Sequence, residues 1–432
     1  MPARFAPARR ARRWSALAAL VLLPASAVAS FERDRVVGAG PAPQTLKIGA
    51  LLDLKRGWAT LGRASRVTLR LAASDANAQL ARSGSPMRVR LRIVDVAGDP
   101  AKAERELRRL AAGGTRVVIG PQASAEVRAV RGAANSLGVV VLSQGSTAHS
   151  LAVRGDNILR LVADDRREAE ALVALLRRDG VDAIVPMWRD DAGNAGLAAS
   201  LRRTFRASGG TVGAGVRYAT DETDFAGRAA ALRGQVAALQ AAGARRVAVY
   251  LAAFDEVVDV FHAAAADPVL NAVNWYGSDG VALSRALVGD AAAATFASRH
   301  RYPNPTLGLD AVGVRRSAAL RRRVRARLGS TPDAFALSAY DGLRIAVRAA
   351  RRAGGTADVP RFRRALVRIA DGYVGVTGPI RLNSAGDRAF DNYDFWSVCA
   401  TGGGFEWRRT FAYAARGVGQ GRIVTRQACP AG

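Results

Sequence analysis

The stretch VVIGPQAS, residues 117–124, joins a short apolar strand to the start of a helix through a glycine and a proline. Three apolar residues in a row, without polar alternation, are typical of a parallel strand buried on both faces. The Gly-Pro pair ends the strand, and we expect Ser124 to be the N-cap of a helix over 124–136. This unit predicts a strand–turn–helix element of a parallel α/β sheet.

The same alternation continues on both sides of this unit. The other elements expected in the first half are strands 46–52, 89–94 and 139–142 with helices 63–80 and 101–112. After Asp164 the pattern restarts with helices 165–178, 195–207, 225–242 and 256–266 and strands 183–187, 211–216, 247–251 and 272–276. Helices 314–328, 334–352 and 361–369 follow, and about sixty residues of β structure close the chain. The sequence therefore predicts two doubly wound α/β units.

The first 30 residues have the pattern of a secretory signal peptide. Five arginines precede the apolar stretch 16–23, and Ala27-Val28-Ala29 is a small-x-small cleavage site. The apolar stretch is too short to span a membrane, and no cysteine near the cleavage site offers a lipid anchor. We expect cleavage of 1–30, a flexible leader over 31–45, and an exported, periplasmic or secreted, soluble chain. An uncleaved signal anchor is the alternative.

Composition excludes several classes of function. The 432 residues are 49% apolar and 23% charged, which excludes a disordered chain. The net charge is +28, but all but three of the 64 basic residues are arginine, and they are spread along helices such as 315–327. This pattern predicts solvated helix faces and salt-sensitive attraction of anions, not a specific nucleic-acid site. Three histidines and two cysteines exclude a Cys/His metal cluster, and we expect no metal or cofactor.

The two cysteines are Cys399, next to the expected strand 392–398, and Cys429, close to the end of the chain. Export allows disulfides, so we expect a Cys399–Cys429 bridge that encloses 29 residues and ties the tail to the strand. Two free thiols are the alternative.

Five loops at the ends of predicted strands carry polar or small residues: 120–124, 143–148, 189–194, 252–255 and 276–280. Ligands of open α/β sheets bind at the carboxyl ends of the strands. Ser124 with helix N–H groups, and the hydroxyls of Ser146 and Thr147, would form a shelf for a carboxylate. Gly145 lets a ligand approach the backbone, and Asp279 would face a cation. For the first two loops, capping and turn roles are equally open from sequence alone, and for Asp279 a turn role is the commoner use.

These loops, together with stretches elsewhere, resemble the exported solute-binding proteins of ABC transporters in the branched-chain amino-acid (Leu/Ile/Val-binding) group. The matching stretches are KIGALLD (47–53), DVAGDP (95–100), IGP with a serine (119–124), SQGST (143–147), YGSDG (276–280), AYDGL (339–343) and GVTGPI (375–380). Each is weak alone, but their order and spacing are specific, and they cover nearly all of residues 46–400.

The resemblance implies a type I periplasmic binding protein, or Venus-flytrap, fold: two doubly wound α/β lobes joined by a three-strand hinge. Lobe 1 would comprise 46–161 and 298–375, and lobe 2 would comprise 162–297 and 376–432. A protein of this kind is not an enzyme. It captures an amino-acid-like solute between its lobes and delivers it to an ABC permease in the membrane, and we expect a monomer.

By resemblance, Ser124 and Thr147 hydrogen-bond the α-carboxylate of the solute, and the Gly145 carbonyl and the Asp279 carboxylate take its α-ammonium. Relatives often have an aromatic residue where this chain has Gly193, so branched-chain specificity does not follow. Other amino acids, amides, small peptides and aromatic acids stay open. The ligand-binding set that we predict is Ser124, Gly145, Ser146, Thr147, Asp279, Trp58, Phe254 and Gly193.

Three other functions compete with solute delivery. A ligand sensor for a receptor fits the same fold, and a binding protein that has lost its ligand fits the altered Gly193 loop. A secreted α/β enzyme needs a nucleophile and a base, yet the chain has no G-x-S-x-G elbow, P-loop, H-E-x-x-H or G-x-G-x-x-G after its first strand. The pair Ser146 and His149 is the nearest candidate, and no orienting acid is evident for it.

Overall fold

The computed structural model describes residues 44–417 and 419–429. The expected signal peptide (1–30) and most of the expected leader lie outside these residues. The last two leader positions, Gln44 and Thr45, belong to the first strand because they pair with Met87 and Arg88. Within the described ranges no helix is long and apolar enough to cross a bilayer.

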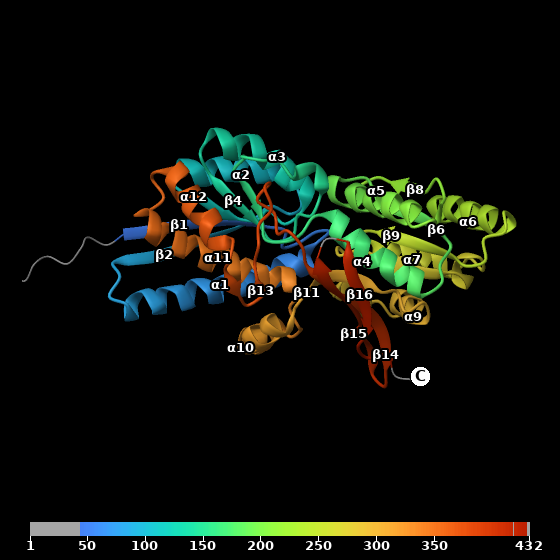
Figure 1. Ribbon diagram of the computed structural model, residues 1–432. Coiled ribbons are helices and arrows are strands. Elements are labelled where there is room, and N and C mark those ends of the chain that lie inside the picture. Colours follow the sequence, from blue (N-terminus) through green and yellow to red (C-terminus); the bar gives the residue numbers. More distant parts are fainter. Residues whose placement is uncertain (1–43, 418, 430–432) are drawn as a thin grey trace, which may run out of the picture. The chain divides into compact units, whose positions relative to one another are not determined.

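A five-stranded parallel sheet, in the order β2-β1-β3-β4-β5, forms the first lobe (Figure 1). Its strands are β1 (Gln44–Leu52), β2 (Met87–Asp95), β3 (Val117–Ile119), β4 (Val140–Ser143) and β5 (Ile158–Arg160). The central strands β3 and β4 are buried at every position, as expected for continuous apolar runs in a parallel sheet. All five strands end at one edge, so the loops that follow them meet there.

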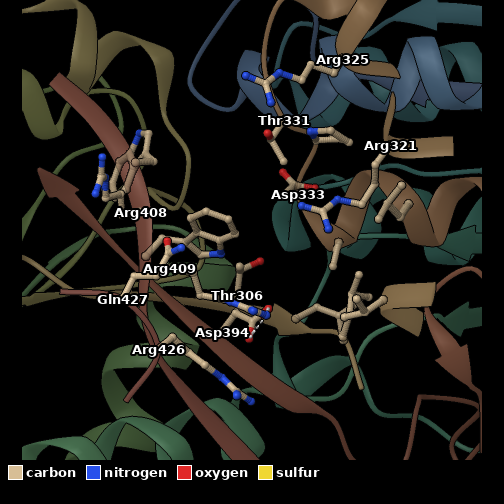
Figure 2. A pocket seen from close by; sticks show the side chains of 18 of the residues that line it. Thr306, Arg321, Arg325, Thr331, Asp333, Asp394, Arg408, Arg409, Arg426 and Gln427 are labelled. Carbon is tan, nitrogen blue, oxygen red and sulfur yellow. Dashed lines mark hydrogen bonds and ion pairs between the residues drawn. The ribbon is translucent and has the colours of Figure 1, made fainter. Parts of the chain in front are cut away.

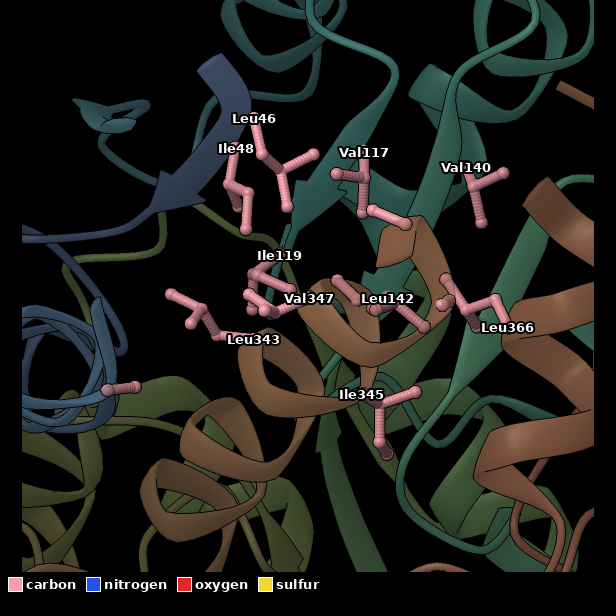
Figure 3. Packing of buried hydrophobic residues seen from close by; sticks show 14 of the residues in the cluster. Leu46, Ile48, Val117, Ile119, Val140, Leu142, Leu343, Ile345, Val347 and Leu366 are labelled. Atoms are coloured by element: carbon pink, nitrogen blue, oxygen red, sulfur yellow. The ribbon is translucent and has the colours of Figure 1, made fainter. Parts of the chain in front are cut away.

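Helices cover both faces of this sheet. One face carries α2 (Pro100–Ala112) and α3 (Ser124–Ser136), and the other carries α1 (Ala59–Arg82), α11 (Ala334–Ala353) and α12 (Val359–Ala370). Figure 3 shows side chains of the sheet, such as Ile119 and Leu142, next to Leu343 and Val347 of α11. Residues 334–370 therefore return to complete the core of a lobe that the chain left at Asp164.

The second lobe has its own parallel sheet, in the order β10-β9-β6-β7, with β8 paired to β6. Its strands are β6 (Ala183–Arg189), β7 (Thr211–Val212), β8 (Val216–Tyr218), β9 (Val247–Ala252) and β10 (Asn274–Gly277). Helices α4 (Asp165–Arg178) and α5 (Ala192–Ala207) pack on one face, and α6 (Ala226–Ala241), α7 (Val257–Ala265) and α9 (Ala291–Arg299), which follows the short α8 (Arg285–Gly289), pack on the other. The single strand predicted over 211–216 is two short strands, because Gly215 takes a φ of +88° that interrupts the extended backbone.

A separate antiparallel sheet contains β11 (Asn304–Gly308), β14 (Asn392–Thr401), β15 (Gly404–Gly417) and β16 (Gln420–Thr425). Strand β11 was not predicted, because a proline in the sequence NPTLG argues against a strand. Its partner β14 is the predicted strand 392–398, extended by three residues. Cys399 of β14 is bonded to Cys429 with their Cα atoms 5.3 Å apart, which confirms the predicted disulfide.

We propose that the chain crosses between the lobes three times. β11 pairs with β14, which packs on the second lobe, whereas Ile380 lies in the core of the first lobe. Helix α10 (Ala311–Leu328) and the small hairpin of β12 (Val374–Gly375) and β13 (Gly378–Pro379) lie between these segments in sequence. We therefore propose crossings near residues 162, 309 and 391, the last two later than the lobe boundaries expected at 298 and 376. The first and third crossings are joined, since the Ala163 N–H donates to the Asp391 carboxylate at 2.9 Å.

Candidate functional site

Seven of the eight predicted ligand-binding residues line one small cavity at the strand ends of both lobes. The eighth, Ser146, lies beside it, with its hydroxyl 3.0 Å from that of Ser124. The predicted residues that line the cavity are Trp58, Ser124, Gly145, Thr147, Gly193, Phe254 and Asp279. Ala123, Asn194 and Leu197 complete its walls.

Ser124 is not the N-cap that we expected. Helix α3 begins at Ser124 itself and Ala123 occupies the cap position. The Ala123 N–H is satisfied by the Glu126 carboxylate, at 3.1 Å, so the first turn does not need a serine cap. The Ser124 hydroxyl instead accepts the Ala148 N–H at 3.2 Å and meets Ser146. It thereby joins the loops that follow β3 and β4 into one shelf.

A buried arginine holds this shelf from behind. Arg160, at the end of β5, is completely buried and forms a bidentate pair with Asp387 at 2.6 and 2.7 Å. It also donates to the carbonyl of Ala148 at 2.7 Å. Such a fork with several acceptors fixes the backbone that carries the hydroxyls. Sequence reasoning missed both partners, although a charged residue that ends a buried apolar strand is a usable signal.

The aromatic wall of the cavity comes from both lobes. The Asp53 carboxylate accepts the N–H groups of Arg56 and Trp58 at 2.8 and 3.0 Å, and Gln122 donates to the Trp58 carbonyl at 2.7 Å. These bonds fix the loop that presents the indole. The ring of Trp58 stacks on Phe254 with centroids 5.1 Å apart. The two aromatic residues predicted for the site are therefore in direct contact with each other.

On the second lobe, Asp191 caps α5 by accepting the N–H groups of Gly193 and Asn194 at 2.8 and 3.0 Å. A Cβ placed on Gly193 would lie 3.6 Å from the Ser124 hydroxyl. A methyl group fits there and an aromatic ring does not. The side-chain oxygen of Asn194, a residue 1% exposed, has no hydrogen-bond partner among the described residues. It is an acceptor available to a ligand.

Asp279 lines the cavity, and two further buried carboxyl groups, Asp165 and Glu168, act on it from behind the wall; we call these three groups the acidic end of the site. Asp165, Glu168 and Asp279 are 0%, 2% and 5% exposed, and the Asp279 N–H donates to Glu168 at 3.3 Å. Burial raises the pKa of Asp165 to about 7. Burial also raises the pKa of Glu168 and of Asp279 well above the usual carboxyl range, and repulsion among the three groups adds to the effect.

Within the described part of the chain, no basic side chain forms an ion pair with these three carboxyl groups. One oxygen of each carboxyl group has no hydrogen-bond partner among the described residues. The nearest guanidinium, Arg160, is already paired with Asp387. The described residues contain no group of acidic, histidine or cysteine side chains arranged to hold a metal ion. An organic cation, such as an ammonium group, is the chemical complement of this arrangement.

Sequence reasoning found Asp279 but missed Asp165, Glu168 and Asn194. The usable signal was on helix α4, where Asp165 and Glu168 share a face with Leu172 and Leu175 at helical spacing. A carboxylate on the apolar face of an amphipathic helix is rarely left without a partner or function.

The cavity is very small. Its volume is about 10 Å³, and a single water needs about 10–15 Å³. Trp58, Ala123 and Phe254 also line a second cavity of about 550 Å³, so the aromatic stack is part of the wall between the two spaces. A solute of amino-acid size enters the site only when this wall moves.

The Ser146–His149 pair lacks the geometry of a catalytic couple. His149 does have an acidic neighbour, contrary to our expectation, because its Nδ1 lies 3.2 Å from the Asp164 carboxylate. The Ser146 hydroxyl meets Ser124 instead, and no hydrogen bond between Ser146 and His149 occurs in the described part of the chain. The histidine therefore is not placed to take the proton of this serine.

Comparisons with known proteins identify the family and the fold of the chain. A family model described as periplasmic binding protein matches residues 45–402. Uncharacterized protein MJ1266 of Methanocaldococcus jannaschii is 25% identical over 388 residues, which cover 84% of this chain and 89% of that protein. Two solved structures share the fold at 17% identity. The leucine binding protein LivK from Thermotoga maritima gives a TM-score of 0.69, covering 84% of this chain and 97% of its own. A solute-binding protein of an ABC transporter from R. palustris, in complex with benzoate, gives a TM-score of 0.67, and the match covers 90% of this chain and 99% of that protein.

Proposed function

We propose, from the premise that this chain belongs to the periplasmic binding protein family, that it is an exported protein that captures a small amino-acid-like solute and delivers it to an ABC permease. One observation carries the proposal. Ser124 and Thr147 of the first lobe and the carboxyl residue Asp279 of the second lobe line the same cavity, and one Asp279 oxygen has no hydrogen-bond partner among the described residues. A zwitterion carries one charge that suits the hydroxyl donors and one that suits the carboxyl group.

The donor end suits a carboxylate. Ser124 and Thr147 line the cavity with the backbone of Gly145 between them in space, and a Cβ on this glycine would come within 3.0 Å of the Gln122 carbonyl oxygen. Leucine and benzoate, named for the two structural neighbours, both carry a carboxylate. Donors fixed by Arg160 and by α3 would therefore serve either class of solute.

The acidic end distinguishes the two classes. Leucine carries an ammonium group and benzoate does not. Burying Asp165, Glu168 and Asp279 together keeps protons on carboxyl groups at neutral pH, and an ammonium group would replace such a proton with a favourable ion pair. Benzoate would gain nothing there. The geometry therefore supports an amine-bearing solute, with its side chain toward the Trp58–Phe254 stack.

Calorimetric titration of the protein purified after export tests this proposal. The ligand panel comprises the common amino acids, their amides and benzoate, and the variants are Asp279→Asn and Thr147→Val. The matched control is Asp190→Asn, which removes an exposed carboxylate outside the site. We expect one amino acid or amide to bind in a 1:1 ratio. Both site variants should weaken it by roughly tenfold or more, as expected for loss of a charged hydrogen bond, and the control should not.

Two results would contradict the proposal. Binding of benzoate that is tighter than any amino acid and indifferent to Asp279→Asn would assign the site to aromatic acids. A folded protein that binds no member of the panel would remove the solute-capture role.

A ligand sensor for a receptor is the remaining alternative with the same site. Solute-dependent stimulation of ATP hydrolysis by a co-reconstituted permease supports delivery, and its absence supports sensing. A secreted enzyme is the weaker alternative. Recovery of the bound solute unchanged after prolonged incubation would count against it.

A further inference from the structure

A second pocket, of about 670 Å³, lies away from the solute cavity and shares no lining residue with it. We call it the arginine pocket. Its walls come from α10, α11, β11, β14 and β15 and from the segment after β16. Figure 2 shows Arg321 and Arg325 on one side of this space and Arg408 and Arg409 on the other. The fifth arginine of the lining is Arg426.

The positive charges exceed the negative charges in this pocket. Arg409 pairs with Asp394 at 3.2 Å, and Arg408 pairs with Glu406 at 2.5 Å. The guanidinium groups of the other three arginines form no hydrogen bond to an acceptor that faces the pocket, among the described residues. The third acid, Asp333, is used as the N-cap of α11, and burial raises its pKa to about 6. Asp333 is still mostly ionised at neutral pH, so five arginines face three acidic side chains in the lining and the positive excess remains.

Arg321 is the arginine that most needs an anion. It lies partly buried on α10, and no hydrogen bond or ion pair of its side chain occurs within the described ranges. The charge of Arg409 acts on it across the pocket, and burial together with this repulsion lowers its pKa. A guanidinium in this setting gains from any acceptor that can bridge it to Arg409.

A buried hydroxyl points to the same space. Thr306 of β11 is 1% exposed and lines the pocket, and its Oγ1 has no hydrogen-bond partner in the described part of the chain. In Figure 2 it lies in the middle of the view with Asp394, between the two groups of arginines. A buried hydroxyl without a partner is unfavourable, so an acceptor atom at this position would stabilise the protein.

We propose that the arginine pocket binds a small oxyanion of two or more negative charges, of the polycarboxylate or phosphate class, held by Arg321, Arg409 and Thr306. The bidentate geometry of guanidinium groups matches carboxylate and phosphate oxygens equally well. The pocket is basic where the solute cavity is acidic. Its ligand therefore belongs to a different chemical class from the transported solute, and the proposal stands independently of the proposed function.

Titration of the protein purified after export, at constant ionic strength, tests this site. The probes are citrate and inorganic phosphate, with chloride as the monovalent reference. The variants are Arg321→Gln and Thr306→Val, and the matched control is Arg322→Gln, which removes an exposed arginine of the same helix that does not line the pocket. We expect saturable 1:1 binding of at least one probe. It should weaken by roughly tenfold or more in Arg321→Gln, weaken in Thr306→Val, and stay unchanged in Arg322→Gln.

The comparison of the probes identifies the source: tighter citrate binding indicates a polycarboxylate, and tighter phosphate binding a phosphate compound. Equal weakening by Arg321→Gln and Arg322→Gln would show attraction by net charge alone and would overturn the proposal. The proposal would also be overturned if neither citrate nor phosphate bound saturably when present at about ten times the concentration of the buffer's own anions. Thermal unfolding of each variant verifies that it is folded.

Discussion

We predict that the buried carboxyl of Asp165 makes the stability of the protein fall as pH rises from about 4 toward neutrality. Its pKa is about 7 in the folded protein against 3.8 for an ordinary aspartate. Between these values the folded chain binds more protons than the unfolded chain, so the free energy of unfolding decreases with increasing pH. The full difference corresponds to about 4 kcal/mol, of which about 2 kcal/mol is lost between pH 5 and pH 7.

Asp165→Asn removes this titration. The amide oxygen of the asparagine can still accept the His149 N–H, which lies 3.3 Å from the Asp165 carboxylate in the wild type. We expect the variant to gain about 2 kcal/mol relative to the wild type between pH 5 and pH 7. Urea unfolding at pH 5, 6 and 7, followed by circular dichroism, measures the difference. Asp190→Asn, which changes an exposed aspartate, should give a pH dependence parallel to the wild type.

A parallel pH dependence for Asp165→Asn would refute the reasoning. It would mean that the carboxyl of Asp165 is ionised at pH 5 in the folded protein and that a positive charge pairs with it there. Asp165 would then no longer support the proposal that an ammonium group binds at the acidic end, which would depend on Glu168 and Asp279 alone.

Three other substitutions test buried features outside the acidic end. Arg160→Met leaves Asp387 buried without its partner and should cost about 3–5 kcal/mol of unfolding free energy; a cost below about 1 kcal/mol, measured by urea denaturation, would contradict the pairing. Cys429→Ser should cost about 3–4 kcal/mol for a loop of this size, and a reducing agent should lower the melting temperature of the wild type but not of the variant. Gly120→Ala should cost at least about 2 kcal/mol, because its φ is +80° and a Cβ would lie 2.2 Å from a backbone carbonyl oxygen. Gly132→Ala, on the open side of helix α3, is the control and should be neutral or slightly stabilising; scanning calorimetry of both variants measures the difference.

Much of the fold was predictable because local and tertiary preferences agree. Strand 117–119 and helices 124–136 and 165–178 have the predicted bounds. Their apolar runs and helical periodicity coincide with the faces that the sheet and the helices bury. Strand β11 was missed because its pairing with β14 overrides a proline and a glycine. Only a long-range contact makes this segment a strand, and no local pattern reports it.

The candidate site was predictable to the extent that it depends on topology. Loops that follow parallel strands meet at one edge, and this rule brought Ser124 and Asp279 into one cavity. The rule does not apply to side chains that reach the site from a helix face, so Glu168 was missed. It also does not distinguish a serine that caps a helix from one that joins two loops. That choice depends on Glu126, whose side chain accepts the Ala123 N–H at the start of helix α3 and leaves the Ser124 hydroxyl free for other contacts.

The hydrogen bond between Ala163 and Asp391 limits how the lobes can move. This bond joins the first and third of the crossings proposed above, so we expect the two segments to bend together as one ribbon. A domain pair linked by three independent strands has rotational freedom about several axes, whereas a ribbon and one further strand favour a swing in one plane. Solute capture in such a protein would follow a one-dimensional path, so that each position along the swing fixes the spacing of donors and carboxyls in the site.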